Sequence, residues 1–233
     1  MYELLLERAE FLALLEAVDA RAIVGIAREK LFPLDEEEHR AVVKQGIVQL
    51  GQRDLLDRDD QPRPDLLKLV RIVAYPQIVF LVVRHVQALG PQLFLLYQSH
   101  EGIVEQTFPT EGTHRLAIIP DIPLLLARAV QILELPEVLP TRSSVEISQE
   151  EFFQCNELAR QGQSGAALEI LRRAGMPAFE ADALVTTMHQ PVFSGDIAVL
   201  KCAHETIIDA RDITILRDHT MTWSATQIVP GEP

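Results

Sequence analysis

The chain has few basic residues and no long apolar run. Lysine and arginine together number 21 against 34 aspartate and glutamate residues, which gives a formal net charge of -13. Because non-specific binding to nucleic acid is mostly contact between phosphates and lysine or arginine, this charge argues against nucleic acid as the main partner. It also disfavours an anionic membrane surface. No apolar run approaches the roughly 18 residues of a membrane-spanning helix, so we predict no membrane insertion.

The sequence also lacks the common signatures of catalysis and of cofactor binding. Its 11 glycines are scattered, and neither GxGxxG nor GxxxxGK[ST] occurs, so nucleotide binding lacks its usual phosphate-binding loop. Gly162–Gly165 has the form of a serine nucleophile elbow, but it lies between two predicted helices and not after a strand. The sequence therefore predicts a protein that is not an enzyme and that holds no cofactor and no metal.

The cellular location is predicted from the first residues and from the cysteines. Residues 1–8 place charges within an apolar stretch and have no basic n-region, so we expect no secretory signal. The two cysteines, Cys155 and Cys202, are expected to be free and buried, because a cytosolic chain of this size does not need a disulfide. The expected absence of a signal favours a cytoplasmic protein.

What the sequence does contain is a short stretch that occurs twice. Residues 99–105 read SHEGIVE and residues 203–209 read AHETIID. Another histidine follows each copy, His114 in the first and His219 in the second. Ahead of each copy, a Leu-Val pair is followed by five residues and a proline, at residues 69–76 and 184–191. These matches predict two related halves.

The first half reads as helices, then strands, then a closing helix. Apolar residues at spacings of three, four and seven predict a helix over 3–18, and Asp35 is placed to cap a second helix over 36–51. A β-branched run follows from residue 77. The remaining predicted elements are a helix from 65 to 75, strands at 77–88, 93–97, 103–108 and 114–119, and a helix from 121 to 133.

The second half is similar but shorter. Ser148 and Glu151 form a capping box for a helix to about 161, and two more helices follow before a period-two pattern of strands. A proline-bearing linker over 135–144 sets a boundary near 140, with an N-terminal half of 1–140 and a C-terminal half of 141–233 that ends in a disordered tail. The predicted fold class is α+β, with two pseudo-symmetric halves. Each half has helices followed by an antiparallel meander, and the two meanders are candidates for a shared central sheet.

The paired histidines and glutamates can be interpreted in two ways. Imidazole and carboxylate can bind zinc or relay protons, so a duplicated metal or acid-base site is one hypothesis. We favour hairpin tips, because residues 99–102 lie between two predicted strands and end in a glycine suited to positive φ. His100, Glu101, His204 and Glu205 then point into solvent, where they are candidates for contact with a partner protein.

The order of elements resembles the EspG family, the cytosolic chaperones of type VII secretion. The likeness rests on Leu50–Leu56, the proline-bearing loop after it, the segment from Asp65 to Pro76, the meander with its glycine-containing tip, and the leucine-rich helix that ends at Pro136. The resemblance implies two α/β halves about a central sheet. It also implies a role in keeping helical PE/PPE-type export substrates soluble by covering their apolar tips.

Two classes of function are therefore expected from the sequence. The first is a non-enzymatic protein-binding chaperone or adaptor, which uses an exposed sheet face or edge to dock another chain. The alternative is a transcriptional regulator or scaffold with tandem winged-helix-like modules, because three helices precede a hairpin in each half. That alternative requires a basic recognition helix, and the third helix of the first half offers only Lys68 and Arg71.

Overall fold

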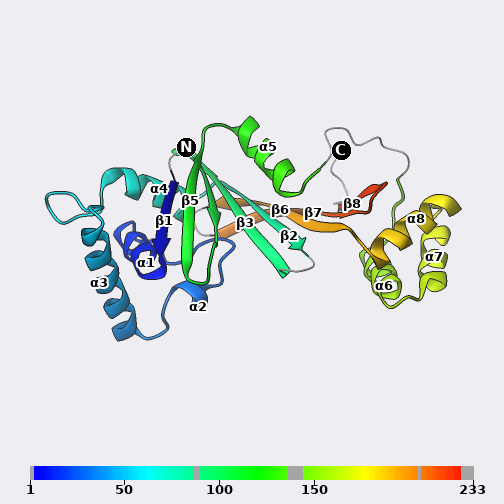
Figure 1. Ribbon diagram of the computed structural model, residues 1–233, viewed down its shortest axis with the longest axis horizontal. Helices are drawn as coiled ribbons and strands as arrows, with labels where there is room; N and C mark the ends of the chain where they lie inside the picture. The colour runs from blue at the N-terminus through cyan, green and yellow to red at the C-terminus, as the bar shows by residue number, and fades with distance from the viewer. Residues whose placement is uncertain (1–2, 87–89, 136–143, 204–205, 227–233) are drawn as a thin grey trace. The chain divides into compact units, whose positions relative to one another are not determined.

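The structure is a computed structural model that describes residues 3–86, 90–135, 144–203 and 206–226 (Figure 1). Within these residues the chain forms eight helices and eight strands. The helices are α1 (Arg8–Ala17), α2 (Arg28–Leu31), α3 (Glu36–Gln52), α4 (Pro64–Ala74), α5 (Ile122–Ile132), α6 (Gln149–Arg160), α7 (Ser164–Arg173) and α8 (Ala178–His189). The strands are β1 (Glu3–Glu7), β2 (Ile78–Val86), β3 (Gly90–Ser99), β4 (Gly102–Thr107), β5 (Thr113–Ile119), β6 (Phe193–Ala203), β7 (Thr206–Arg217) and β8 (Thr222–Thr226).

All eight strands belong to one antiparallel sheet with the order β1-β5-β4-β3-β2-β6-β7-β8. The first meander comprises β2 to β5, and the second comprises β6 to β8. Their first strands, β2 and β6, are neighbours, so the two meanders share one sheet. The predicted α+β class with a shared sheet and a helix after the first meander is confirmed.

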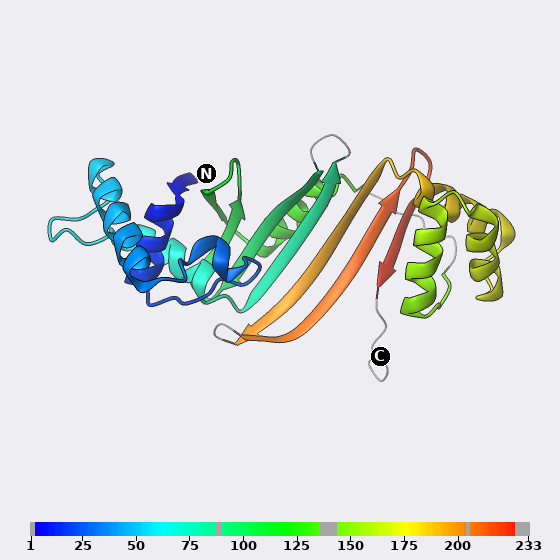
Figure 2. The ribbon, with the colours of Figure 1, turned by 90° about the horizontal axis from the view of Figure 1, so that it is seen from below.

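The chain divides into two compact units, and β2, β3, β6 and β7 each contribute residues to both. Unit 1 contains the described residues of Met1–Val82, Leu93–Ile132 and Ala198–Arg211. In this unit α1 and α4 cover one face of the sheet and α5 the other (Figure 2). A Cβ atom at Gly46 of α3 would lie 2.0 Å from the carbonyl oxygen of Ala9 in α1. The close packing of these two helices therefore requires glycine at this position.

Unit 2 contains the described residues of Val83–Gln92, Leu133–Ile197 and Asp212–Pro233. Its helices α6, α7 and α8 pack on one another around a small core, and Leu216 of β7 belongs to that core. The buried side chains are Cys155, Ala159, Ala167, Ile170, Leu171, Met176, Ala181, Leu184, Val185 and Met188. Because burial raises the pKa of the Cys155 thiol to about 11, this thiol is protonated and unreactive near neutral pH.

The predicted N-terminal helix is wrong for its first five residues. Glu3–Glu7 is a strand in which Leu4 and Leu6 are buried while Glu3, Leu5 and Glu7 are exposed. This period-two pattern is set by pairing with β5, where Leu4 lies opposite Leu116. The helix begins only at Arg8, because pairing with a distant strand overrides a spacing of leucines that also fits a helix.

The other helix ends agree closely with the sequence. Asp35 accepts hydrogen bonds from the backbone N–H groups of Glu37 and Glu38, and Ser148 and Glu151 form the predicted capping box. β3 begins at Gly90, three residues before the start of the predicted strand at 93–97. Most of the predicted linker, His204, Glu205 and the tail from residue 227 lie outside the described residues, so the boundary near 140 stays a prediction. Within the described part of the chain, no helix is long and apolar enough to span a membrane.

Candidate partner-binding site

The first histidine–glutamate stretch is a hairpin tip, as predicted. β3 and β4 are joined there, with Ser99 opposite Gly102, and Gly102 has a φ of +146°. The tip is bonded to α4, because the Glu101 carboxylate accepts hydrogen bonds from Arg71 of that helix at 3.2 and 3.4 Å. His100 is exposed. The prediction that Glu101 points freely into solvent is therefore wrong, while contact of His100 and Glu101 with a partner stays a prediction.

His114 does not join this tip. It lies in β5 opposite Leu6 and is buried, whereas His100 lies beyond the far end of β4. The Gln106 side-chain amide donates a hydrogen bond of 2.9 Å to Nδ1 of His114, and the ring packs 4.4 Å from that of Phe11. Burial, and then the charge of Arg8, lowers the pKa of His114 to about 4. His114 is therefore a neutral core residue of the strand that the sequence predicted at 114–119.

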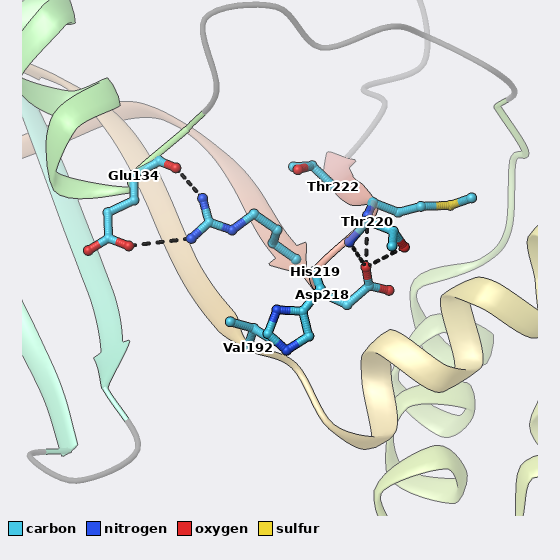
Figure 3. A pocket seen from close by; sticks show the side chains of 8 residues that line it. Glu134, Val192, Asp218, His219, Thr220 and Thr222 are labelled. Carbon is cyan, nitrogen blue, oxygen red and sulfur yellow. Dashed lines mark hydrogen bonds and ion pairs between the residues drawn. The ribbon is translucent and has the colours of Figure 1, made fainter.

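His219, the corresponding histidine of the second half, lines a cavity of about 460 Å³ in unit 2. The cavity is formed around the turn between β7 and β8 (Figure 3). Arg217 donates hydrogen bonds to the carboxylate of Glu134 at 3.3 Å and to its backbone carbonyl, and it lies over the Phe193 ring at 5.2 Å. The positive charge in this cavity is thus already paired with an acidic partner.

The carboxylate in the same cavity is satisfied as well. Burial raises the pKa of Asp218, but hydrogen bonds from Thr187, Thr220 and Met221 outweigh burial and lower the pKa to about 2. The donors are the Thr187 hydroxyl at 2.6 Å and the backbone N–H groups of Thr220 and Met221 at 2.6 and 2.7 Å. Asp218 therefore shapes the turn. Among the described residues, no group of three or more histidine, cysteine, aspartate and glutamate side chains is placed to hold a metal ion.

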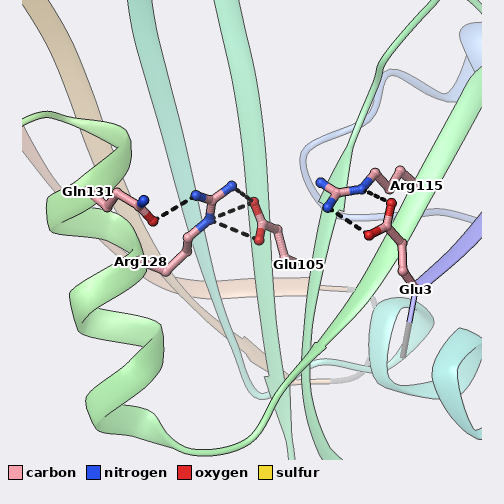
Figure 4. Close-up of polar contacts among 5 residues, drawn as sticks. All are labelled: Glu3, Glu105, Arg115, Arg128 and Gln131. Carbon is pink, nitrogen blue, oxygen red and sulfur yellow. Dashed lines mark hydrogen bonds and ion pairs between the residues drawn. The ribbon is translucent and has the colours of Figure 1, made fainter. Parts of the chain in front are cut away.

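Helix α5 in unit 1 offers a better binding surface. It is fixed to the sheet by Arg128, which donates three hydrogen bonds of 2.8 to 3.0 Å to the buried carboxylate of Glu105 on β4 (Figure 4). Arg128 also donates to Gln131 at 2.9 Å. On the same face Arg115 of β5 pairs with Glu3 of β1 (Figure 4). Since Arg128 is turned toward the sheet, it contributes little charge to the outer side of the helix.

The outer side of α5 is apolar. Leu125, Ala129 and Ile132 are buried against the sheet, but four large apolar side chains of the same helix are 43–51% exposed. These side chains, which we name the α5 surface, are Ile122, Leu124, Leu126 and Val130. Three of them lie four residues apart, at 122, 126 and 130, and so form one ridge along the helix. A ridge of this kind fits the groove of a partner helix.

The sequence predicted the helix but not this surface. The pattern of its apolar residues does not show which side of the helix is exposed. The available signal was composition, because residues 122–132 contain only two polar side chains, Arg128 and Gln131. A helix with so few polar residues is typically buried on all sides, whereas in this chain one side of it is exposed.

The fold and the site together describe a protein with helices on an eight-stranded antiparallel sheet, an apolar outer helix face and satisfied polar clusters. A chaperone has this fold. The chain is similar to the type VII secretion system chaperone EspG5 of Mycobacterium tuberculosis, solved in complex with a PE25-PPE41 dimer. The TM-score is 0.67 over 97% of this chain and 90% of that chain, with 12% sequence identity. At that identity the match shows a common fold. No protein-family model and no curated protein matches the sequence.

Proposed function

We propose that this protein is a non-enzymatic, protein-binding chaperone or adaptor that shields an apolar helical segment of its partner. The observation that carries the proposal is the α5 surface, where four large apolar side chains are exposed on a helix firmly held by Glu105 and Arg128. Monomeric soluble proteins rarely expose contiguous apolar groups without a partner for them. The structural match to a chaperone that was solved with a protein dimer supports the same role.

The kind of partner follows from the shape of this surface. Ile122, Leu126 and Val130 form a ridge with a spacing of four residues, which packs best into the groove between side-chain rows of another helix. A partner helix with an apolar stripe would bury these side chains and hide its own stripe from water. The ridge itself indicates only a helical partner. Because the similar chaperone was solved with a PE25-PPE41 dimer, we propose a helical export substrate of type VII secretion, of the PE/PPE kind, as the partner, and the cytoplasm as the place of binding.

The tandem winged-helix alternative receives less support. It requires two separate modules, whereas β2 and β6 join both meanders in one sheet. It also requires a basic recognition helix, and Arg71 of α4 is already bound to Glu101. The net charge of -13 remains unfavourable for contact with phosphates.

The proposal is tested by co-purifying the tagged protein from its native host and repeating the purification with Leu126→Glu. A charge in the middle of the ridge adds a desolvation cost to binding, so we expect the helical partner to be reduced on the order of tenfold or more. Mass spectrometry identifies the captured protein, and titration calorimetry with that protein then measures the change in dissociation constant.

A matched control is Val48→Glu on α3. Val48 is 54% exposed, close to the exposure of Leu126, but it lies on a different helix of unit 1. We expect this variant to retain the partner, because the substitution adds the same charge away from the α5 surface. Equal loss in both variants would indicate a general effect of charge, and retention in both would contradict a role for α5.

A further inference from the structure

Part of strand β7 has no described neighbour along its outer edge, which we name the bare edge. β7 has 12 residues, and among the described residues β8 pairs with the last five of them, Ile213–Arg217 (Figure 2). Within the described residues, no strand lies along the outer edge of Thr206–Asp212. Every side chain from Thr206 to Ile213 is exposed, and Ile207 and Ile208 are 48% and 56% exposed. A strand that is exposed on both faces and unpaired along one edge is a template for another strand.

Two hydrogen bonds show which backbone groups face outward. The Arg217 carbonyl oxygen accepts from the N–H of Val192, on the side of β6, at 2.9 Å. The Asp212 carbonyl oxygen accepts from the Thr226 hydroxyl, on the side of β8, at 3.2 Å. Since backbone groups alternate along a strand, the N–H and C=O groups of Ile208, Ala210 and Asp212 are directed to the outer edge. An antiparallel partner strand would bond to these three residues, and at Asp212 its N–H would share the carbonyl oxygen with the Thr226 hydroxyl.

We propose that this edge binds the same edge of a second copy of the chain, with Ala210 opposite Ala210 on a two-fold axis. Within one chain Arg211 already lies 4.0 Å from Asp209. This register places Asp209 opposite Arg211 of the other copy, and Arg211 opposite Asp209, so each charge gains a second, oppositely charged neighbour across the axis. Ile208 and Asp212 form the outermost rungs. The charge pattern of the strand is thus complementary to itself when it is reversed, which is what a two-fold interface requires.

Neighbouring registers do not share this match. An axis through Asp209 sets two aspartates directly opposite each other, which is unfavourable on a strand surface. The length of the ladder is also limited, because β8 occupies the same edge from Ile213 onward. Five residues of each chain and about six backbone hydrogen bonds then form the contact. An interface of this size is weak, with a dissociation constant on the order of micromolar or higher.

The test is sedimentation velocity of the full chain over a wide range of protein concentrations, with single charge reversals. In Asp209→Lys both positions are basic, and in Arg211→Glu both are acidic, so each variant repels its own copy. We expect dimerisation of each variant to be weakened on the order of tenfold. A mixture of the two variants places the introduced lysine of one chain opposite the introduced glutamate of the other, and the second pair, Arg211 and Asp209, is intact. The mixture is therefore expected to associate as strongly as the original chain.

Glu29→Lys and Lys30→Glu in α2 are matched controls, because both residues are exposed and the changes in net charge are the same. We expect these variants, alone or mixed, to dimerise like the original chain. Circular dichroism and thermal unfolding check that all variants are folded. The double reversal, Asp209→Arg with Arg211→Asp, keeps the opposite-charge pairs and is expected to restore dimerisation within one chain.

Three results would overturn the proposal. The first is a chain that stays monomeric at all concentrations. The second is association that the charge reversals do not change, or that mixing does not restore. The third is dimerisation that is seen only after residues 227–233 are removed, since the chain's own end would then occupy the edge. None of these results bears on the α5 surface, which is tested separately through Leu126.

Discussion

The sheet has two edges, and the outward-facing backbone groups of these edges differ in whether side chains bond to them. β1, at one edge, has only five residues, and side chains bond to two of its outer backbone groups. Arg53 donates a hydrogen bond of 2.9 Å to the Leu5 carbonyl oxygen, and Glu10 accepts one of 2.8 Å from the Glu7 N–H. At the bare edge of β7, the structure shows no such protection of Ile208 or Ala210 among the residues that it describes.

The β1 edge is therefore protected against pairing with another strand, whereas the β7 edge is available for such pairing. Covering backbone groups with charged side chains is a common means by which proteins prevent unwanted strand addition. The protection at β1 is anchored in the core, because the Glu10 carboxylate that receives Arg53 is 1% exposed. The β7 edge instead carries exposed isoleucines beside alternating charges. We infer that the two edges have different roles.

Among changes to polar groups, the largest effect is expected when the protection of β1 is removed with Arg53→Ala. Arg53 donates two hydrogen bonds, of 2.7 and 2.8 Å, to the buried carboxylate of Glu10. Without it the carboxylate is buried next to only one donor, the Glu7 N–H, so we expect the free energy of unfolding to fall by about 3 kcal/mol. Urea unfolding followed by circular dichroism measures this change.

Arg40→Ala serves as the control for Arg53→Ala. Arg40 is an exposed arginine of α3 that donates only to the Glu36 carbonyl oxygen, at 3.3 Å. We expect a change below about 0.5 kcal/mol. If Arg53→Ala costs less than about 1 kcal/mol, the Glu10 carboxylate is not confined as the structure shows, and the contrast between the edges loses its main support.

The protected edge also shows what the sequence could and could not reveal. Helix caps and the β3–β4 tip were predictable, because Asp35, Ser148 and Gly102 act on residues next to them in the chain. The strand Glu3–Glu7 was not, because leucines at 4 and 5 suit a helix equally well until β5 is placed beside them. The partner of Glu10 is 43 residues away, which no local pattern indicates.

The candidate site was predictable only as a helix. The proline and leucines at the start of residues 121–133 identify α5, but whether its second side is covered depends on how the rest of the chain packs. The exposure of the isoleucines of β7 was not predicted for a similar reason. The period-two pattern does not show that the described pairing between β7 and β8 ends at Ile213.

A smaller effect on folding stability is expected from a change of pH, because His114 lies buried in β5, the strand that pairs with β1. His114 lies opposite Leu6, and its pKa is lowered to about 4 in the folded chain against an ordinary value of 6.5. At pH values below the ordinary pKa of histidine, the unfolded chain therefore binds more protons than the folded chain does. Folding stability is unaffected above that pH and is lost as the pH falls toward 4. We expect a loss of about 2 kcal/mol between pH 7 and about pH 5 from this residue.

The pH effect is measured as the difference between the original chain and His114→Phe. The variant has no titrating group at this position, and its phenyl ring can occupy the space beside Phe11. Urea unfolding at a series of pH values should show a shallower loss of stability for the variant. Parallel curves for both proteins would mean that His114 is not buried as a neutral ring behind β1.

The smallest effect on stability is expected at the bare edge, from Ile208→Lys. The Ile208 side chain is more than half exposed, so at low protein concentration we expect a change below about 0.5 kcal/mol in the free energy of unfolding. The same substitution at Leu6, which is fully buried in β1, should cost more than about 3 kcal/mol.

At high protein concentration, the original chain should gain apparent stability from dimerisation, because binding to the folded state raises the free energy of unfolding. Ile208→Lys should lack this gain, since lysine at a strand edge opposes pairing. A loss above about 1 kcal/mol that does not depend on concentration would mean that Ile208 is covered within a single chain.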